Sequence, residues 1–304
     1  MNYFIILLIL APLAWRLFSD YKMGVVWAVF LMTALSANPI LLSGGVMPNF
    51  NMQRLILLVL LIAAVTKSKL TNAKHPIPFM GILALYAAIN LLPIAFSVDR
   101  LASVKAYLAF TIEIVLFYFI ISTSMTTMVD AKRIIAAGGA ALFLVAVLAI
   151  IERYSGFNPV DAFMPDYVRK PQYVDDVLST FPHRILLGTA MAMGWPLALA
   201  LTRFGGAFKR IVWWVAICCM LLVCYLSFSR GPWIAALFAG AIMVLCAGAA
   251  IRQRILIVMA LIGIALIARP GAWETVTTRA QETADVDSFK GQTYQYRWEL
   301  WSIA

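Results

Sequence analysis

The stretch IVWWVAICCMLLVCYLSFSRGPWIAALFAGAIMVLCAGAAI, residues 211–251, contains two long apolar runs, Ile211 to Phe228 and Pro232 to Ile251, with one arginine and a Gly-Pro helix break between them. Each run can cross a bilayer core of about 30 Å, which takes about 20 helical residues. A guanidinium near hydrocarbon costs about 2.5 to 3.5 kcal/mol at a helix centre and less toward the interface, so Arg230 needs water or an anionic partner. Arg230 is either an interfacial arginine that snorkels or part of a small polar pocket at the membrane surface, which the flanking serines and Trp233 favour.

The composition predicts an integral membrane protein. Of 304 residues, 63% are hydrophobic and 12% charged, and the mean hydropathy is +0.90, so polar side chains are too few to cover a soluble globule. Six charge-free stretches are long enough to span: Met23–Gln53, His75–Val98, Ile134–Ile151, Ile185–Thr202, Ile211–Ser229 and Gly231–Ile251. Weaker candidates are Asn2–Trp15, Leu55–Thr66, Ala106–Val129 and Ile255–Ala268. The expected fold is all-α, a polytopic transmembrane helix bundle of about ten helices with outer-face loops.

The basic residues predict the topology. In a soluble protein the net charge of +10 would indicate nucleic acid, but here it marks cytoplasmic turns, so no nucleic-acid partner is expected. The basic clusters are Arg16 and Lys22; Lys67, Lys69 and Lys74; Lys132 and Arg133; Arg203, Lys209 and Arg210; and Arg252 and Arg254. The connections between them then face outward: Ser43–Gln53, Ser97–Ser103, Glu152–Arg184, the Ser229–Pro232 break, and everything after Arg269.

Two of the outer segments are long, and long loops in compact proteins are often functional. Glu152–Arg184 mixes aromatic, acidic and basic residues, and the segment after Arg269 is rich in tyrosine and tryptophan. The latter suits an interfacial helix, a carbohydrate platform or an ordinary aromatic belt. The expected parts are an N-terminal transmembrane bundle (1–151), an outer loop (152–184), transmembrane helices carrying the arginine turn (185–268), and the start of a large outer loop (269–304).

The outward-facing cations suit a diphosphate. They are Arg230, His183, Arg184, Arg169, Lys170, Arg279 and Arg297. Hydrogen bonds to charged groups contribute about 1.5 to 3 kcal/mol each, and arginine can stabilise the charge of a departing diphosphate. No acidic cluster with metal-binding spacing lies on the outer side, although Asp175-Asp176 could hold a divalent cation. The four cysteines lie in apolar spans without metal-ligand spacing, so we expect neither a metal nor a cofactor.

Two further ionisable residues admit two interpretations each. His183, which follows Phe181-Pro182 and precedes a helix, is either a general base or, as we favour, a helix cap. Glu113 is the only carboxylate deep in a predicted span. It is either a proton-relay acid or, as we favour, a neutral or paired structural acid, because a relay needs a second ionisable group at similar depth.

Three motifs in the second half resemble the O-antigen ligase and Wzy-type polymerase family of bacterial polytopic membrane glycosyltransferases. The segment Thr180–Thr189, followed by Trp195–Leu199, looks like the family's F-x-H-P-x-x-L-G stretch leading into a helix. Ser227–Trp233 is similar to its S-x-S-R-G-x-W, and Arg297–Trp301 looks like its R-x-x-x-W helix start. The resemblance covers roughly residues 180 to 304, and the first half matches only in hydropathy.

The resemblance implies a bundle like those of GT-C glycosyltransferases in the bacterial inner membrane. It implies inverting, metal-independent transfer of a glycan from an undecaprenyl diphosphate carrier to an acceptor hydroxyl on the periplasmic side, as in lipopolysaccharide and polysaccharide biosynthesis. The acceptor would be a glycan, lipid A core or a protein. Arg230 and Arg297 would be catalytic. The substrate-binding residues would be His183, Arg184, Arg169, Lys170, Arg279 and Trp233.

The sequence departs from the family pattern in two places. Arg184 stands where the family usually has proline, and the chain stops at Ala304, before the large outer loop whose histidine is thought to activate the acceptor. The chain therefore looks like a C-terminally truncated member of the family, either active or inactive as it stands. The alternative function is a multi-span transporter or flippase for an anionic or lipid-linked substrate, with Glu113 coupling protons. Such a protein should show discontinuous mid-membrane helices or repeated halves, and the sequence indicates neither. A third interpretation is a non-catalytic assembly subunit.

Overall fold

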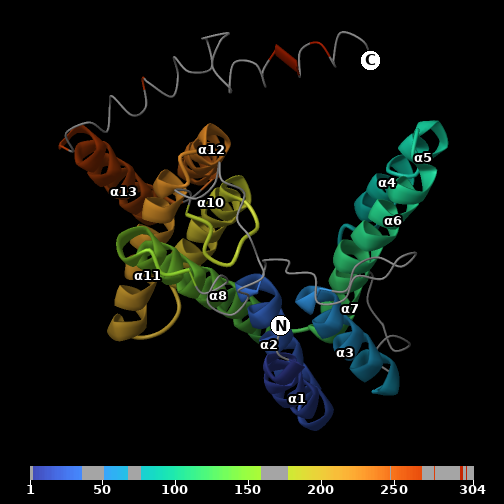
Figure 1. Ribbon diagram of the computed structural model, residues 1–304. Helices are drawn as coiled ribbons and strands as arrows, with labels where there is room; N and C mark the ends of the chain where they lie inside the picture. The colour runs from blue at the N-terminus through green and yellow to red at the C-terminus, as the bar shows by residue number, and fades with distance from the viewer. Residues whose placement is uncertain are drawn as a thin grey trace. The chain divides into compact units, whose positions relative to one another are not determined.

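The computed structural model describes residues 3–35, 51–67, 77–158, 177–246 and 248–268, with single residues at 277, 295, 296 and 299. Regular secondary structure in these residues is helical throughout, which confirms the all-α prediction (Figure 1). The helices are α1 (Tyr3–Ser19), α2 (Tyr21–Ala34), α3 (Met52–Thr66), α4 (Met80–Ile89), α5 (Leu92–Phe96), α6 (Arg100–Phe110), the π-helix η1 (Thr111–Leu116), α7 (Phe117–Ser124), α8 (Met128–Ser155), α10 (Arg184–Leu201), α11 (Ala207–Leu226), α12 (Arg230–Cys246) and α13 (Ala249–Ala268).

Four helical segments are long and apolar enough to cross a membrane: Arg100–Ser124, Met128–Ser155, Arg184–Leu201 and Ala207–Leu226. The first of these runs without a break from α6 through η1 into α7. Five shorter apolar helices, Ile6–Ser19, Tyr21–Ala34, Met52–Thr66, Met80–Phe96 and Arg230–Cys246, accompany them. The expectation of about ten helices is confirmed, and the protein is a multi-pass membrane protein.

Several helices begin or end at capping residues or prolines and not at the ends of the charge-free stretches. The helix expected within Met23–Gln53 ends at Ala34, and α3 starts again at Met52, where the Asn51 side chain accepts the Arg54 backbone N–H at 2.8 Å. In His75–Val98 the helix is interrupted between Ile89 and Leu92, with a proline at the start of α5. Proline lacks the N–H that a continuous helix would use at that point.

The longest helix, α8, has a strong signal at each end. Thr127 and Asp130 form a capping box at its start. At its other end Gly156 takes the left-handed conformation, with φ of 72°. A capping box satisfies backbone donors that the first turn leaves unpaired, and glycine adopts the left-handed C-cap without a Cβ penalty. The helix therefore runs well beyond the predicted Ile134–Ile151 on both sides.

The chain divides into two compact units, Met1–Ala239 and Gly240–Ala304. Within the first unit, one buried apolar cluster joins α1, α2, α3 and α7, and includes Leu17, Val25, Ile56 and Ile120 with no exposed surface. Helices α1 and α2 approach closely at Gly24, where a Cβ would lie 2.5 Å from the Leu17 Cα atom. Only glycine fits such a contact.

Helices α8, α10 and α11 pack against one another and place the candidate site. Trp195 of α10 is 1% exposed, and Met191 of the same helix and Met220 of α11 are fully buried. A Cβ at Gly194 would lie 2.7 Å from the Leu142 side chain, so α10 approaches α8 closely at that point. These three helices give the first unit a closely packed bundle with two distinct ends.

Candidate functional site

The turn between α11 and α12 carries the Ser227–Trp233 motif. Helix α11 ends at Leu226 and α12 begins at Arg230. Phe228 takes a left-handed conformation with φ of 46°, a strained geometry for a bulky residue. The Ser227 hydroxyl, in a residue that is 1% exposed, donates to the Cys224 carbonyl at 2.7 Å. The chain therefore reverses in a tight, fixed turn directly before Arg230.

Trp233 closes this turn from the α12 side. Its indole N–H donates to the same Cys224 carbonyl at 3.0 Å, and its ring stacks on Tyr225 with a centroid separation of 5.7 Å. Two donors thus satisfy a carbonyl that the end of α11 leaves without a helical partner. Trp233 was predicted to bind substrate, and its indole N–H is used to hold the turn.

Arg230 stands at the first residue of α12 and is half-buried. In the part of the chain that the structure describes, no hydrogen bond or ion pair joins Arg230 to another side chain. Pro232, in the same first turn, needs no N–H partner there. A cation at a helix N-terminus adds to the positive end of the helix dipole, and such a site attracts anions.

Helix α10 lies directly against this turn. A Cβ at Gly188 would be 2.6 Å from the Ser227 Oγ atom and 2.8 Å from the Pro232 ring, so the absence of a side chain at Gly188 permits the contact. Gly188 belongs to the His183–Gly188 stretch, about 7.5 Å of helix rise from His183. The structure therefore brings two of the three motifs to one end of the α8–α10–α11 bundle.

His183 is the N-cap of α10. Its Nδ1 atom accepts the Ile185 backbone N–H at 3.1 Å, which agrees with the capping role that we favoured. Nδ1 carries no proton while it accepts this bond. Arg184 follows in the first turn of α10 with its Nε atom buried.

The buried carboxylate of Glu152, which the sequence did not reveal, fixes the backbone that leads to His183. Glu152, 7% exposed at the end of α8, accepts the backbone N–H groups of Leu178 at 3.1 Å and Ser179 at 2.5 Å. It also accepts the Asn158 side-chain amide at 2.6 Å. The Ser179 hydroxyl donates to the Val145 carbonyl at 3.0 Å. The chain that leaves α8 and the chain that enters α10 are thereby tied together.

Nothing in the sequence distinguishes Glu152 from a solvated acid. It follows the apolar stretch Ile134–Ile151 and stands at the predicted start of an outer loop. The only available signal was Gly156 four residues later, which marks a helix end. The backbone donors that bury the carboxylate come from residues more than 20 positions away.

Glu113 has the partner that its sequence context did not show. The Arg54 Nε atom of α3 donates to the Glu113 carboxylate of η1 at 2.7 Å, and the two side chains are 19% and 30% exposed. This agrees with the paired structural acid that we favoured. Because a guanidinium does not give up its proton in proteins, the pair lacks the second titrating group that a proton relay needs.

The remaining predicted site residues lie outside the described residues. They are Arg169, Lys170, Arg279 and Arg297, together with the acidic pair Asp175-Asp176. Among the described residues, no group of three or more His, Cys, Asp and Glu side chains could hold a metal ion. The part of the candidate site that the structure describes thus consists of His183, Arg184 and Arg230 around the Gly188 contact.

Comparison with known proteins supports the resemblance in the C-terminal part. Residues 215–304 match the family model described as O-antigen ligase. This segment contains most of α11, the Ser227–Trp233 turn, α12, α13 and Arg297, whereas His183 and Gly188 lie before it. No curated protein and no solved structure matches the chain.

Proposed function

We propose that this membrane protein, similar over residues 215–304 to O-antigen ligases, transfers a glycan from an undecaprenyl diphosphate carrier to an acceptor hydroxyl at the periplasmic face of the bacterial inner membrane. The similarity to that family implies ligase- or polymerase-type glycosyl transfer. The observation that carries the proposal is Arg230, half-buried at the start of α12 and next to the helix that bears His183 and Arg184.

The chemistry needs a group that accepts negative charge. The acceptor oxygen attacks the sugar C1 atom from the face opposite the carrier, the bond from C1 to the diphosphate oxygen breaks, and the electron pair leaves with the diphosphate. The acceptor hydroxyl proton passes to a base. Arg230, with Arg297 as a second cation, binds the diphosphate and stabilises the charge that develops as it leaves, so neither a metal ion nor a nucleotide sugar takes part.

The other predicted residues bind around this centre. Arg184, Arg169, Lys170 and Arg279 contribute charge on the outer face, and His183 contributes its imidazole to substrate binding. Trp233 supports the proposal by holding the turn in which Arg230 stands. Lipid A core, a growing polysaccharide and a protein are the acceptor classes.

Replacement of Arg230 tests the proposal. In a bacterium that lacks the gene and carries either wild-type or Arg230→Ala protein, we expect transfer to fall at least about tenfold, because a charge-assisted hydrogen bond contributes about 1.5 to 3 kcal/mol. Lipid-linked glycan should accumulate, and the acceptor that loses its glycan identifies the acceptor class. Arg230→Lys should also be defective, because an ammonium does not form the bidentate contact.

Arg153→Ala is the matched control, because Arg153 is an exposed arginine at the end of α8, on the same predicted outer face. It should transfer glycan at the wild-type level. Normal glycan display with Arg230→Ala, at wild-type protein levels in the membrane, would refute the transferase role of Arg230.

The same cells separate transfer from transport. A transferase defect leaves the accumulated lipid-linked glycan exposed to an impermeant periplasmic label, whereas a flippase defect leaves it inaccessible until the membrane is opened. Periplasmic labelling in the Arg230→Ala strain supports transfer. An unlabelled donor pool supports the multi-span transporter or flippase instead.

A further inference from the structure

A pocket lies at the opposite end of the α8–α10–α11 bundle from His183 and Arg230. It has a volume of about 530 Å³, within the range of about 300 to 1,000 Å³ that small-molecule sites occupy. The start of α8 and the turn from α10 to α11 line it: Val129, Lys132, Arg133, Ala136, Leu201, Phe204, Gly205, Phe208, Lys209, Val212 and Trp213. Its lining therefore combines cationic and large apolar side chains and contains no carboxylate.

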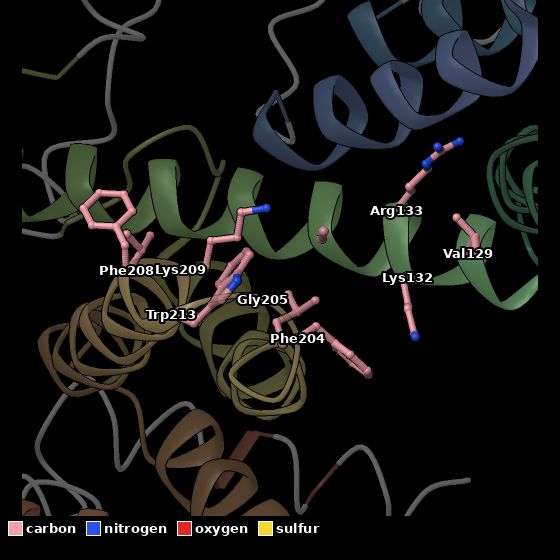
Figure 2. A pocket seen from close by; sticks show the side chains of 11 residues that line it. Val129, Lys132, Arg133, Phe204, Gly205, Phe208, Lys209 and Trp213 are labelled. Atoms are coloured by element: carbon pink, nitrogen blue, oxygen red, sulfur yellow. The ribbon is translucent and has the colours of Figure 1, made fainter.

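Contacts within the pocket hold its lysines in place. The Lys132 Nζ atom lies 4.4 Å from the centroid of the Phe204 ring. Gly205, with φ of 100°, packs beneath the Lys209 stem, and a Cβ there would lie 2.8 Å from the Lys209 Cδ atom. Figure 2 shows Lys132 and Arg133 extending from opposite sides of α8, with Lys132 on the side of Phe204, while Lys209 extends from α11 toward α8.

The two lysines have no acidic partner in the described part of the chain. The ion pairs of Lys22 with Asp130 and of Arg54 with Glu113 in that part of the chain include neither lysine. The first turn of α11 adds to the positive potential, because its N-cap, Gly206, provides no side-chain hydrogen bond. The charge of the pocket is therefore complementary to an anion.

The apolar lining distinguishes a lipid from a free anion. Phe208 is 77% exposed and Phe204 is 43% exposed, and both border the pocket. A Cβ at Gly139 of α8 would lie 3.2 Å from the Trp213 ring, so the indole packs closely against α8 beside the lysines. An occupant with a phosphate and hydrocarbon chains satisfies both kinds of surface at once.

The basic clusters around the pocket belong to turns that the positive-inside rule predicts to be cytoplasmic, namely Lys132 with Arg133 and Arg203 with Lys209 and Arg210. The structure brings these two separate clusters to one end of one bundle. Basic pockets between transmembrane helices on the cytoplasmic side suit anionic headgroups.

We infer that this pocket binds the headgroup of an anionic phospholipid of the cytoplasmic leaflet, with Lys132 and Lys209 as the cations that attract it and the acyl chains along Phe204 and Phe208. This inference is independent of the proposed glycan transfer, because the two sites lie at opposite ends of the bundle. Its consequence is a protein whose α8 and α11 helices are joined by a lipid at the cytoplasmic surface.

The test uses the purified, delipidated chain in a neutral detergent, with short-chain phosphatidylglycerol as the probe. Phosphatidylcholine with the same chains and inorganic phosphate are compared with it. We expect phosphatidylglycerol to raise the thermal unfolding midpoint, and to bind more tightly than phosphatidylcholine. Because each lysine near an anionic surface contributes about fivefold to the affinity, Lys132→Gln with Lys209→Gln should weaken phosphatidylglycerol binding about 30-fold.

Arg210→Gln is the control, because Arg210 is exposed in the first turn of α11 and does not line the pocket. It should bind the anionic lipid like the wild type. The unfolding midpoint without lipid shows whether each variant folds. If the double variant does not fold, the single lysine variants replace it, and each should bind phosphatidylglycerol about fivefold more weakly.

Three results would overturn the inference. Equal binding of phosphatidylcholine would reduce the pocket to an apolar surface. An equal effect of inorganic phosphate would make it a free-anion site. Equal loss in Arg210→Gln would show that only the general positive charge of this end matters.

Discussion

Gly188 offers the sharpest test at the scale of a residue. Gly188→Ala would place a Cβ 2.6 Å from the Ser227 Oγ atom and 2.8 Å from the Pro232 ring, which cannot move unless the backbone beside Arg230 moves. Overpacking of this kind costs about 1 to 3 kcal/mol. We expect reduced glycan transfer, measured in the complemented strain, and a lower unfolding midpoint for the purified protein.

The chain contains a matched glycine control. Gly138 of α8 has no atom within 4 Å of the position that a Cβ would take, so Gly138→Ala should increase helix stability by up to about 1 kcal/mol and leave transfer unchanged. Equal behaviour of Gly188→Ala and Gly138→Ala would show that the contact between α10 and the turn has no role in transfer.

Glu152 tests the other contact that positions His183. Glu152→Gln places an amide NH₂ group against a cluster of donors from Leu178, Ser179 and Asn158. Hydrogen bonds to a charged group contribute about 1.5 to 3 kcal/mol, so the free energy of unfolding should fall by about 2 kcal/mol. Thermal unfolding measures this change, with Arg153→Gln at the adjacent exposed position as the control. An unchanged unfolding midpoint in Glu152→Gln would show that the hydrogen bonds to the carboxylate do not stabilise the fold.

At this scale the sequence was informative where a residue type is unusual in its surroundings. An arginine between two apolar runs could be identified as a site candidate from its cost in hydrocarbon alone. Glu152 could not, because its burial depends on Leu178 and Ser179, which meet it only after the chain has folded. Likewise, the partner of Glu113 is 59 positions away, in another helix.

At the scale of helices, the ion pair between Arg54 and Glu113 joins α3 to the π-helix η1. Arg54→Leu leaves the carboxylate without its guanidinium, and the cost of such a loss is about 1 to 3 kcal/mol for a partly exposed pair. We expect a lower unfolding midpoint for Arg54→Leu and for Glu113→Leu. The double variant should recover much of the loss, because no charge is then left unpaired.

This cycle also separates the two interpretations of Glu113. Additive losses in the double variant would show that the pair does not couple α3 to η1. If Glu113→Leu alone abolished a proton-dependent activity while Arg54→Leu preserved it, the relay interpretation would replace the structural one.

Most helices could be predicted from hydropathy, and their ends could not. The spans Ile185–Thr202 and Ile211–Ser229 agree with α10 and α11 to within a few residues, because a bilayer sets their length and composition. Helix α2 is shorter than the charge-free stretch Met23–Gln53, and α3 starts three residues before Leu55–Thr66, since caps rather than hydropathy decide where they begin and end. The π-helix has no signal in the sequence that we can identify.

At the scale of the first unit, α8, α10 and α11 give the protein two chemically different ends. One end holds Glu152, His183 and the turn before Arg230, and the other holds Lys132, Lys209 and the salt bridge between Lys22 and Asp130. The basic turns around Lys132 and Lys209, both predicted to be cytoplasmic, fall together at the second end. The bundle thus separates the two sets of residues in the way that the positive-inside rule predicts.

Cysteine labelling tests this arrangement across the whole bundle. In a background in which Cys218, Cys219, Cys224 and Cys246 are replaced by alanine, Arg153→Cys marks the end with Glu152, and Arg210→Cys marks the end with Lys209; both positions are exposed. A membrane-impermeant maleimide should label Arg153→Cys in intact spheroplasts, because the positive-inside rule predicts a cytoplasmic position for the cluster around Arg210, and Arg153 lies at the other end of the bundle. Arg210→Cys should react only after the membrane is opened.

The reverse pattern would place Arg230 on the cytoplasmic side, where a periplasmic transferase cannot act, and would move the lysine pocket to the outer leaflet. Labelling of both positions in intact cells would mean that the two ends do not lie on opposite sides of the membrane.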